Sequence, residues 1–275
     1  MYKLVPERRH AVEPETFCQS FKQFFLHMLF ELIGVIMMTL AFKCAMSPFM
    51  VQGGYFLALL IVTKVSGGLC NPAITFACMF RRDDYKMSVK QGLSYMFVQY
   101  LGGFCGALIS LLIQGEAGVP NIQVEYWFSC ICTSVLAGFI IVFMYISQTN
   151  RLTSFTEEIW LSLFIVAGCY LVGALIASQA LGNEYGLALG TLVSGNPAID
   201  FGMQMVMLFK YPGNSLKYIW LFPCVPLGGG ILAILFNDLL YKPAVVQAEE
   251  IDAEIQSQRS ASIANDADFH KQPLI

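Results

Sequence analysis

The sequence predicts an all-α membrane protein that has six transmembrane helices and two half-helices in two inverted repeats. The first observation behind this prediction is composition: 56% of the 275 residues are hydrophobic, 13% are charged, and the mean hydropathy is +0.61. Such a chain has too few polar side chains to cover a soluble globule, so we expect a multi-pass protein of the lipid bilayer. The other observations are six long apolar runs and an Asn-Pro-Ala tripeptide that occurs twice.

The six apolar runs approach or exceed the roughly 20 residues that a membrane-spanning helix needs. They lie near residues 21–42, 44–63, 89–113, 127–147, 159–181 and 216–241. We therefore expect a channel domain over residues 21–242. Within it, the first repeat is assigned to about 21–147, with its boundary near 115–125, and the second to about 126–242. Three spans per repeat invert the second repeat relative to the first.

The two ends of the chain are polar and are expected in the cytoplasm. Residues 1–20 lack an apolar core and form a predicted N-terminal segment, and residues 243–275 are polar and acidic, which predicts a disordered tail. Basic residues such as Arg81 and Arg151 follow the second and fourth spans, which fits cytoplasmic connections. The expected location is the plasma membrane or an intracellular vacuolar or vesicular membrane.

The repeated tripeptide has the chemistry of a helix start. Its two copies are Asn71-Pro72-Ala73 and Asn196-Pro197-Ala198. Asparagine is a preferred N-cap, and proline at the first helical position loses no hydrogen bond. Apolar stretches follow at residues 74–80 and 199–209, which are too short to span a bilayer but long enough for half-helices. A single copy of the tripeptide would most often be an ordinary helix start in a loop, whereas the pair indicates two half-helices that meet.

Two half-helices that meet at the bilayer midplane predict a pore centre. Their positive ends would repel cations and hydronium. The amides of Asn71 and Asn196 could donate hydrogen bonds to a passing oxygen, and Ala73 and Ala198 are small enough for the two turns to touch.

Longer segments around these positions resemble one known family. Residues 66–75, Ser-Gly-Gly-Leu-Cys-Asn-Pro-Ala-Ile-Thr, resemble its SGxxxNPAVT motif, Glu31 to Gly34 resembles its EFLG, and Gln99 to Gly103 resembles its Q-x-x-G. The chain is identified on these residues as a member of the major intrinsic protein family, the aquaporins and aquaglyceroporins. The resemblance implies a homotetramer with one water or solute pore per protomer, and it implies that Glu31 and Gln99 support the pore loops.

Departures from the family pattern bear on the solute. Most members have an arginine directly after the second tripeptide, where this chain has Ile199, and the constriction position that is often aromatic or His is Val51. With Val193 or another residue of 182–193, these side chains are expected to line the outer constriction. The resemblance then implies a wider, less polar filter without the positive charge, which favours glycerol, urea or ammonia besides water. Because an apolar constriction can also dewet and close, conduction of water alone stays an alternative. Asp200 resembles the NPARD of glycerol-conducting members, although it could equally stabilise the local helix dipole.

Lys64 is an ionisable residue near membrane depth, and such residues usually have a partner. We hypothesise that it pairs with Glu31 and supports the pore. The alternative is that its ammonium extends toward the cytoplasmic headgroups.

Other function classes find little support in the sequence. No nucleophile and base pair, metal-ligand cluster or phosphate loop occurs, so no enzyme, cofactor or metal is expected, and a net charge of −3 gives no sign of a nucleic-acid partner. Two alternatives stay open. One is a closed or poorly conducting relative with a junctional or scaffolding role. The other, less favoured because paired intramembrane acids are lacking, is an alternating-access transporter.

Overall fold

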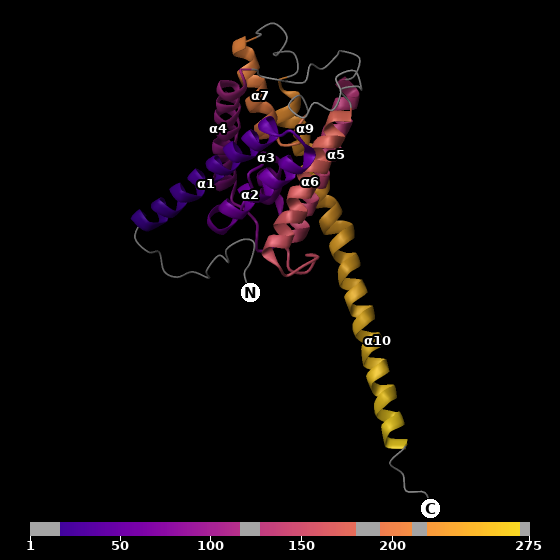
Figure 1. Cartoon of the computed structure of the whole chain (residues 1–275). Coiled ribbons are helices and arrows are strands. Elements are labelled where there is room, and N and C mark those ends of the chain that lie inside the picture. The colour runs from indigo at the N-terminus through magenta and orange to yellow at the C-terminus, as the bar shows by residue number, and fades with distance from the viewer. Residues whose placement is uncertain (1–16, 116–126, 180–192, 211–218, 270–275) are drawn as a thin grey trace, which may run out of the picture. The chain divides into compact units, whose positions relative to one another are not determined.

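The computed structural model describes residues 17–115, 127–179, 193–210 and 219–269, and the regular structure in these ranges is helical. The helices in chain order are α1 (Phe17–Cys44), α2 (Pro48–Ser66), α3 (Pro72–Phe80), α4 (Val89–Gln114), α5 (Trp127–Thr149), α6 (Ile159–Gln179), α7 (Pro197–Lys210), α9 (Leu221–Phe236), the π-helix η4 (Asn237–Tyr241) and α10 (Lys242–Phe269) (Figure 1). The chain divides into a helical bundle that ends at Ile234 and a C-terminal unit that begins at Leu235.

Six helical segments within these ranges are long and apolar enough to cross a membrane, which confirms the six predicted spans. They are Phe21–Cys44, Pro48–Ser66, Val89–Gln114, Trp127–Thr149, Ile159–Ser178 and Pro223–Ser260. The helices α3 and α7 are shorter, as expected of half-helices. Part of the predicted sixth span, residues 211–218, lies outside the described residues.

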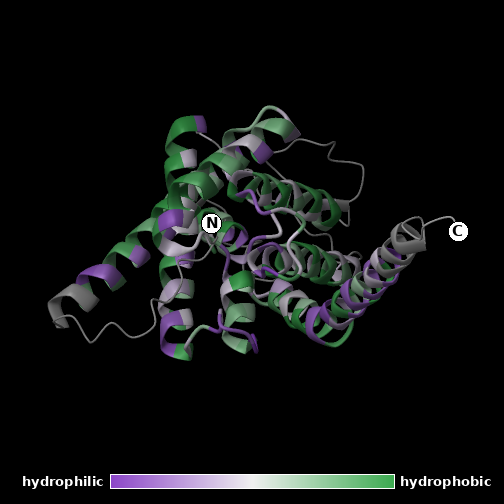
Figure 2. Cartoon of the chain, turned by 90° about the horizontal axis from the view of Figure 1, so that it is seen from below, coloured by the Kyte–Doolittle hydropathy of each residue, from purple (hydrophilic) through white to green (hydrophobic). Residues whose placement is uncertain are grey.

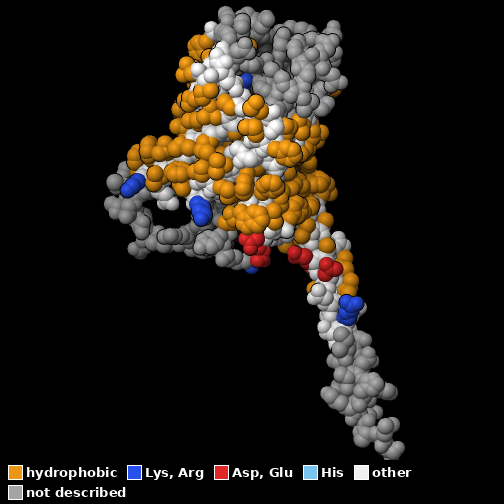
Figure 3. All heavy atoms as spheres, viewed as in Figure 1, with side chains coloured by type: hydrophobic (Ala, Val, Ile, Leu, Met, Phe, Trp, Pro, Cys, Tyr) orange, Lys and Arg blue, Asp and Glu red, His pale blue; other side chains and the backbone are white. Residues whose placement is uncertain are grey.

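Large apolar side chains face outward from these helices. Phe97 is 70% exposed and Leu112 is 78% exposed, both on α4. Figure 2 shows that the helices of the bundle are largely hydrophobic, and Figure 3 shows hydrophobic side chains over the side of the bundle with charged groups at its lower edge. In water this surface would be unfavourable, whereas against lipid tails it costs nothing.

Packing places both half-helices inside the bundle. Helix α4 packs against α1, α3 and α7, while α3 also contacts α5 and α7. The backbones of α4 and α7 approach closely because glycines face each other: a methyl group added at Gly103 would overlap the Ala198 carbonyl, and one at Gly202 would overlap the Gly103 backbone. Small residues permit this contact between membrane helices.

The C-terminal unit differs from the expectation for residues 243–275. The prediction of a disordered tail is wrong for residues up to Phe269, because η4 continues directly into α10. Between Ala244 and Phe269 the sequence contains neither glycine nor proline and is rich in alanine, glutamate and glutamine, which favour helix. Low hydrophobicity therefore signalled an exposed segment here, not an unstructured one.

Candidate functional site

Both Asn-Pro-Ala tripeptides begin a helix. The Asn71 side-chain oxygen accepts a hydrogen bond from the Ala73 N–H at 2.8 Å at the start of α3, and Asn196 accepts one from the Ala198 N–H at 3.1 Å at the start of α7. Pro72 and Pro197 are the first residues of these helices, where the missing N–H has no cost. Each half of the chain thus caps its half-helix in the same way.

The residue before each asparagine has left-handed backbone geometry. Gly195 has φ of 70°, which glycine adopts freely, and Cys70 has φ of 45°. For a residue with a Cβ this conformation costs on the order of 1–2 kcal/mol. The surrounding contacts therefore hold the first loop in a shape that Cys70 alone would not prefer.

The two loops meet through one hydrogen bond. The Asn196 Nδ2 donates to the Cys70 carbonyl at 2.8 Å, whereas the Asn71 Nδ2 has no hydrogen-bond partner among the described residues. Both asparagines are fully buried, as are Ala73 and Ala198. The predicted pair of equivalent donors is thus unequal in this structure, since one amide joins the repeats and the other is free.

A buried carboxylate holds the first loop. Glu31 on α1 accepts hydrogen bonds from the Leu69 N–H at 3.2 Å, from the Cys70 N–H at 2.7 Å and from the Gln99 side chain at 2.7 Å. Gln99 in turn lies 2.9 Å from the Thr75 hydroxyl on α3. One network therefore connects α1, α4, the loop and the first half-helix.

Three buried tyrosines on three helices donate to the backbone carbonyls of the same loop. The pairs are Tyr95 with Ser66 at 3.5 Å, Tyr145 with Gly67 at 3.0 Å and Tyr170 with Leu69 at 3.4 Å. Together with the bond from Asn196, they occupy what we call the loop-one carbonyls, those of Ser66, Gly67, Leu69 and Cys70. The sequence does not point to these tyrosines, because nothing in their spacing separates them from the other tyrosines of the chain.

The residues predicted to form the outer constriction are buried but do not all lie together. Val51 and Ile199 belong to the main apolar cluster of the bundle. Val193 belongs to a second cluster with Ala137 and Leu221. The other candidates for this position, residues 182–192, lie outside the described residues.

Asp200 acts locally in the second loop. One of its carboxylate oxygens accepts a hydrogen bond from the Ser194 N–H at 2.7 Å, and the side chain is almost fully buried in the first turn of α7. A carboxylate at a helix start is stabilised by the helix dipole. The geometry matches the dipole-stabilising alternative.

A match to the model of one protein family shows to which family the chain belongs. A family model described as major intrinsic protein matches residues 43–237. The chain belongs to the major intrinsic protein family. Members of this family are channels of the membrane and not a class of enzyme.

Relatives of known name agree with this assignment. The chain is similar to a probable aquaporin TIP5-1 of Oryza sativa subsp. japonica, with 27% identity over 76% of this chain and 74% of the relative. It is 28% identical to aquaglyceroporin-3 of Trypanosoma brucei brucei over 68% of this chain and 63% of that protein. The crystal structure of the aquaglyceroporin from Plasmodium falciparum shares the fold, with a TM-score of 0.59 and 18% identity over 82% of this chain and 99% of that one.

The hypothesised pairing of Lys64 with Glu31 is not present in the described part of this major intrinsic protein. Lys64 is exposed in the last turn of α2, whereas Glu31 is fully buried, and no ion pair joins them in the described part of the chain. The hydrogen bonds of Glu31 go to backbone N–H groups and to Gln99 instead. Lys64 lies near the C-terminal end of its helix, where its positive charge interacts favourably with the helix dipole.

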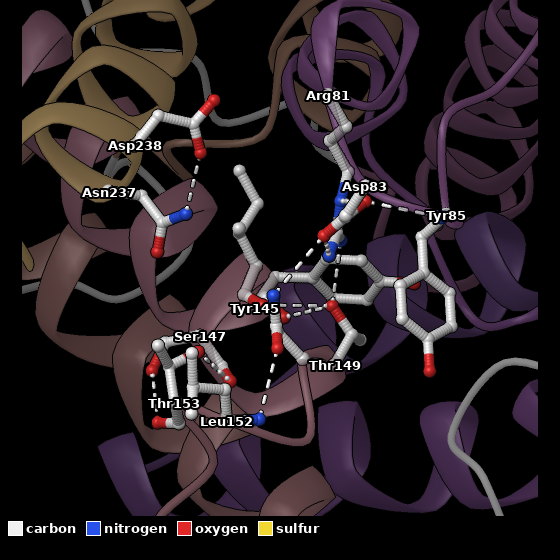
Figure 4. Close-up of polar contacts among 12 residues, drawn as sticks. Arg81, Asp83, Tyr85, Tyr145, Ser147, Thr149, Leu152, Thr153, Asn237 and Asp238 are labelled. Atoms are coloured by element: carbon white, nitrogen blue, oxygen red, sulfur yellow. Dashed lines mark hydrogen bonds and ion pairs between the residues drawn. The ribbon is translucent and has the colours of Figure 1, made fainter. Parts of the chain in front are cut away.

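A polar cluster ties the end of α3 to the end of α5 (Figure 4). Arg81, which is 3% exposed, makes two hydrogen bonds with Asp83 at 2.6 and 2.8 Å and one with the Thr149 hydroxyl at 2.9 Å. The Asn150 side chain reaches Asp83 at 3.3 Å. Burial lowers the pKa of Arg81, but the hydrogen bonds and charge of Asp83, together with the neighbouring Cys78 and Tyr145, outweigh it and raise the pKa. The guanidinium therefore stays charged and fixes the far end of the half-helix.

Proposed function

We propose that this major intrinsic protein is a passive, bidirectional channel that conducts water and small neutral solutes in single file. The observation that carries the proposal is the meeting of two identically capped half-helix starts, linked by the hydrogen bond from Asn196 to the Cys70 carbonyl. Helix N-termini that converge on one point create a positive potential, which opposes cations and hydronium but not neutral molecules.

Glycerol, urea or ammonia are the solutes that we propose besides water. Ile199 and Val51 put apolar side chains where most family members have an arginine and often an aromatic residue. Without a fixed cation at this level, exclusion of protons falls on the dipoles of α3 and α7. The similarity to a protein named aquaglyceroporin-3 is consistent with a polyol as one solute.

The testing experiment is stopped-flow light scattering on proteoliposomes of the purified protein. Swelling in a glycerol gradient is compared with shrinkage under an impermeant osmolyte, for the native chain, for Ile199→Arg and for Ile199→Met as a control of similar size. Rapid flux of both water and glycerol, with glycerol lost selectively in Ile199→Arg, is the expected result. Flux no greater than that of empty liposomes would refute conduction.

A second candidate function is a closed or poorly conducting protein with a junctional or scaffolding role. The observation that favours it is the burial of the centre: Asn71 and Asn196 have no exposed surface, and the loop-one carbonyls are bonded within the protein. A well-folded preparation without flux would support this function over conduction.

We further propose a homotetramer with one pore per protomer and with both termini in the cytoplasm. The basic residues Arg81, Arg82 and Arg151 in the connections favour that orientation under the positive-inside rule. Cross-linking in native membranes would test the tetramer, and protease cleavage of the tail in sealed vesicles of known orientation would test the topology.

A further inference from the structure

Four backbone carbonyls of the first loop already accept hydrogen bonds from within the protein. Left-handed geometry at Gly67, Gly68 and Cys70, with φ of 95°, 67° and 45°, turns the chain sharply between α2 and α3. Backbone carbonyls that line a pore are the groups to which a passing solute would donate its hydrogen bonds. In this structure three tyrosine hydroxyls and one asparagine amide occupy the loop-one carbonyls.

Of the three tyrosines that bond the first loop, Tyr170 bonds the carbonyl closest in sequence to Asn71. Its hydroxyl bonds the Leu69 carbonyl, two residues before Asn71, and lies beside the Asn71 side chain. Its ring is fully buried and packs edge-on against Tyr55, with ring centroids 5.3 Å apart. Tyr170, packed against the ring of Tyr55, thus lies next to Asn71.

Two neighbours of Tyr170 carry unpaired polar atoms. The Asn71 Nδ2 and the Tyr55 hydroxyl are both buried and have no hydrogen-bond partner among the described residues. Buried donors without partners are unfavourable, so a small molecule that both donates and accepts hydrogen bonds would be stabilised here. Because the buried ring of Tyr170 lies next to Asn71, its size would limit which molecule can reach the Asn71 amide.

The bond that Tyr170 makes is a weak one. Its hydroxyl is 3.4 Å from the Leu69 carbonyl oxygen, longer than the 3.0 Å of the bond from Tyr145 to Gly67. O–H···O bonds are strongest near 2.7–2.8 Å and weaken as the distance grows. Exchange of this bond for one to a solute therefore costs less than exchange of the bond from Tyr145.

We propose that Tyr170 is the residue that sets solute size in this pore. The inference rests on the proposed channel function and adds a second constriction, at the pore centre, to the one proposed at Val51 and Ile199. The ring of Tyr170 admits water beside Asn71 and retards molecules as wide as glycerol. Its hydroxyl holds the Leu69 carbonyl until a permeating oxygen takes over that bond.

The test compares glycerol and water permeability in proteoliposomes for the native chain and for Tyr170→Ala, Tyr170→Val and Tyr170→Phe. The ratio of glycerol to water permeability should rise about tenfold in Tyr170→Ala, a change that corresponds to a barrier lower by only about 1.4 kcal/mol. Tyr170→Val should show a smaller rise. Tyr170→Phe keeps the ring, so its ratio should equal the native one, while its water permeability increases because the Leu69 carbonyl is released.

Tyr100→Ala is the matched control. Tyr100 also donates its hydroxyl to a backbone carbonyl, that of Pro223 at 3.0 Å, and packs edge-on against Phe201, but it makes no described bond to the first loop. Its loss should leave the permeability ratio unchanged. Size-exclusion chromatography selects the folded fraction of each variant, and Tyr170→Val carries the test if Tyr170→Ala does not fold.

The outcomes separate this inference from the proposed function. If the native chain conducts and the ratio is the same in Tyr170→Ala, Tyr170→Val and the native chain, the role of Tyr170 is refuted while the channel stands. If neither the native chain nor any folded variant conducts, the channel function is refuted and the role of Tyr170 with it. If the native chain is closed and Tyr170→Ala or Tyr170→Val conducts, both are supported.

Discussion

Replacing Glu31 by glutamine tests whether the first loop depends on a charged acceptor. The Oε2 of Glu31 accepts two hydrogen bonds and its Oε1 accepts one, all within a fully buried site. Glutamine can keep an oxygen at the position with two bonds, but its NH₂ group then faces the Leu69 N–H. A hydrogen bond to a charged group contributes about 1.5–3 kcal/mol, so we expect the free energy of unfolding to fall by about 2 kcal/mol.

This loss converts to a shift in melting temperature. For chains of 150–250 residues, 1 kcal/mol shifts the Tm by about 2–4 °C, so Glu31→Gln should melt about 4–8 °C lower than the native protein. The assay is heating of detergent-solubilised protein followed by fluorescence-detected size exclusion. Glu157→Gln, at an exposed position, is the control and should melt like the native chain. The reasoning is refuted if Glu31→Gln and Glu157→Gln melt together.

Three further changes have expected outcomes. Gly103→Ala drives a methyl group into the backbone of α7 and should lower the free energy of unfolding by about 1–3 kcal/mol, seen as aggregation at a lower temperature on heating. The control Gly53→Ala meets no atom within 4 Å and should not destabilise the protein. Equal behaviour of the two variants would contradict the close contact. Asp83→Ala leaves the buried Arg81 charge without its carboxylate, which should lower the free energy of unfolding by about 3 kcal/mol. Proteolysis of residues 81–88 should then be faster, and an unchanged cleavage rate would argue against a stabilising role of the cluster. Lys64→Gln should alter neither melting nor flux, and a loss like that of Glu31→Gln would restore the discarded pairing.

Much of the fold follows from the sequence because the bilayer imposes one rule. A spanning helix needs a long apolar run, so the six runs indicate the six spans directly. The half-helix starts are also local, since an N-cap and the proline after it lie within three residues. Asn71 and Asn196 could therefore be assigned from their immediate neighbours.

The contacts at the centre depend on distances along the chain that no local pattern encodes. Tyr145 reaches a carbonyl 78 residues away and Tyr170 reaches one 101 residues away. The sequence places Lys64 on a spanning helix, but it does not show that the side chain is exposed. The tail differs for another reason: its low hydrophobicity predicts disorder, but its residues favour helix.

The hydrogen bonds of the first loop also constrain the order of assembly. The acceptor at Ser66 finds its donor on α4, within the first half, but Gly67, Leu69 and Cys70 depend on Tyr145, Tyr170 and Asn196, which the ribosome adds later. Buried carbonyls without donors are unfavourable in a membrane. The first half can thus insert its helices as it emerges, but its own central loop is completed only when the second half has been synthesised through residue 196.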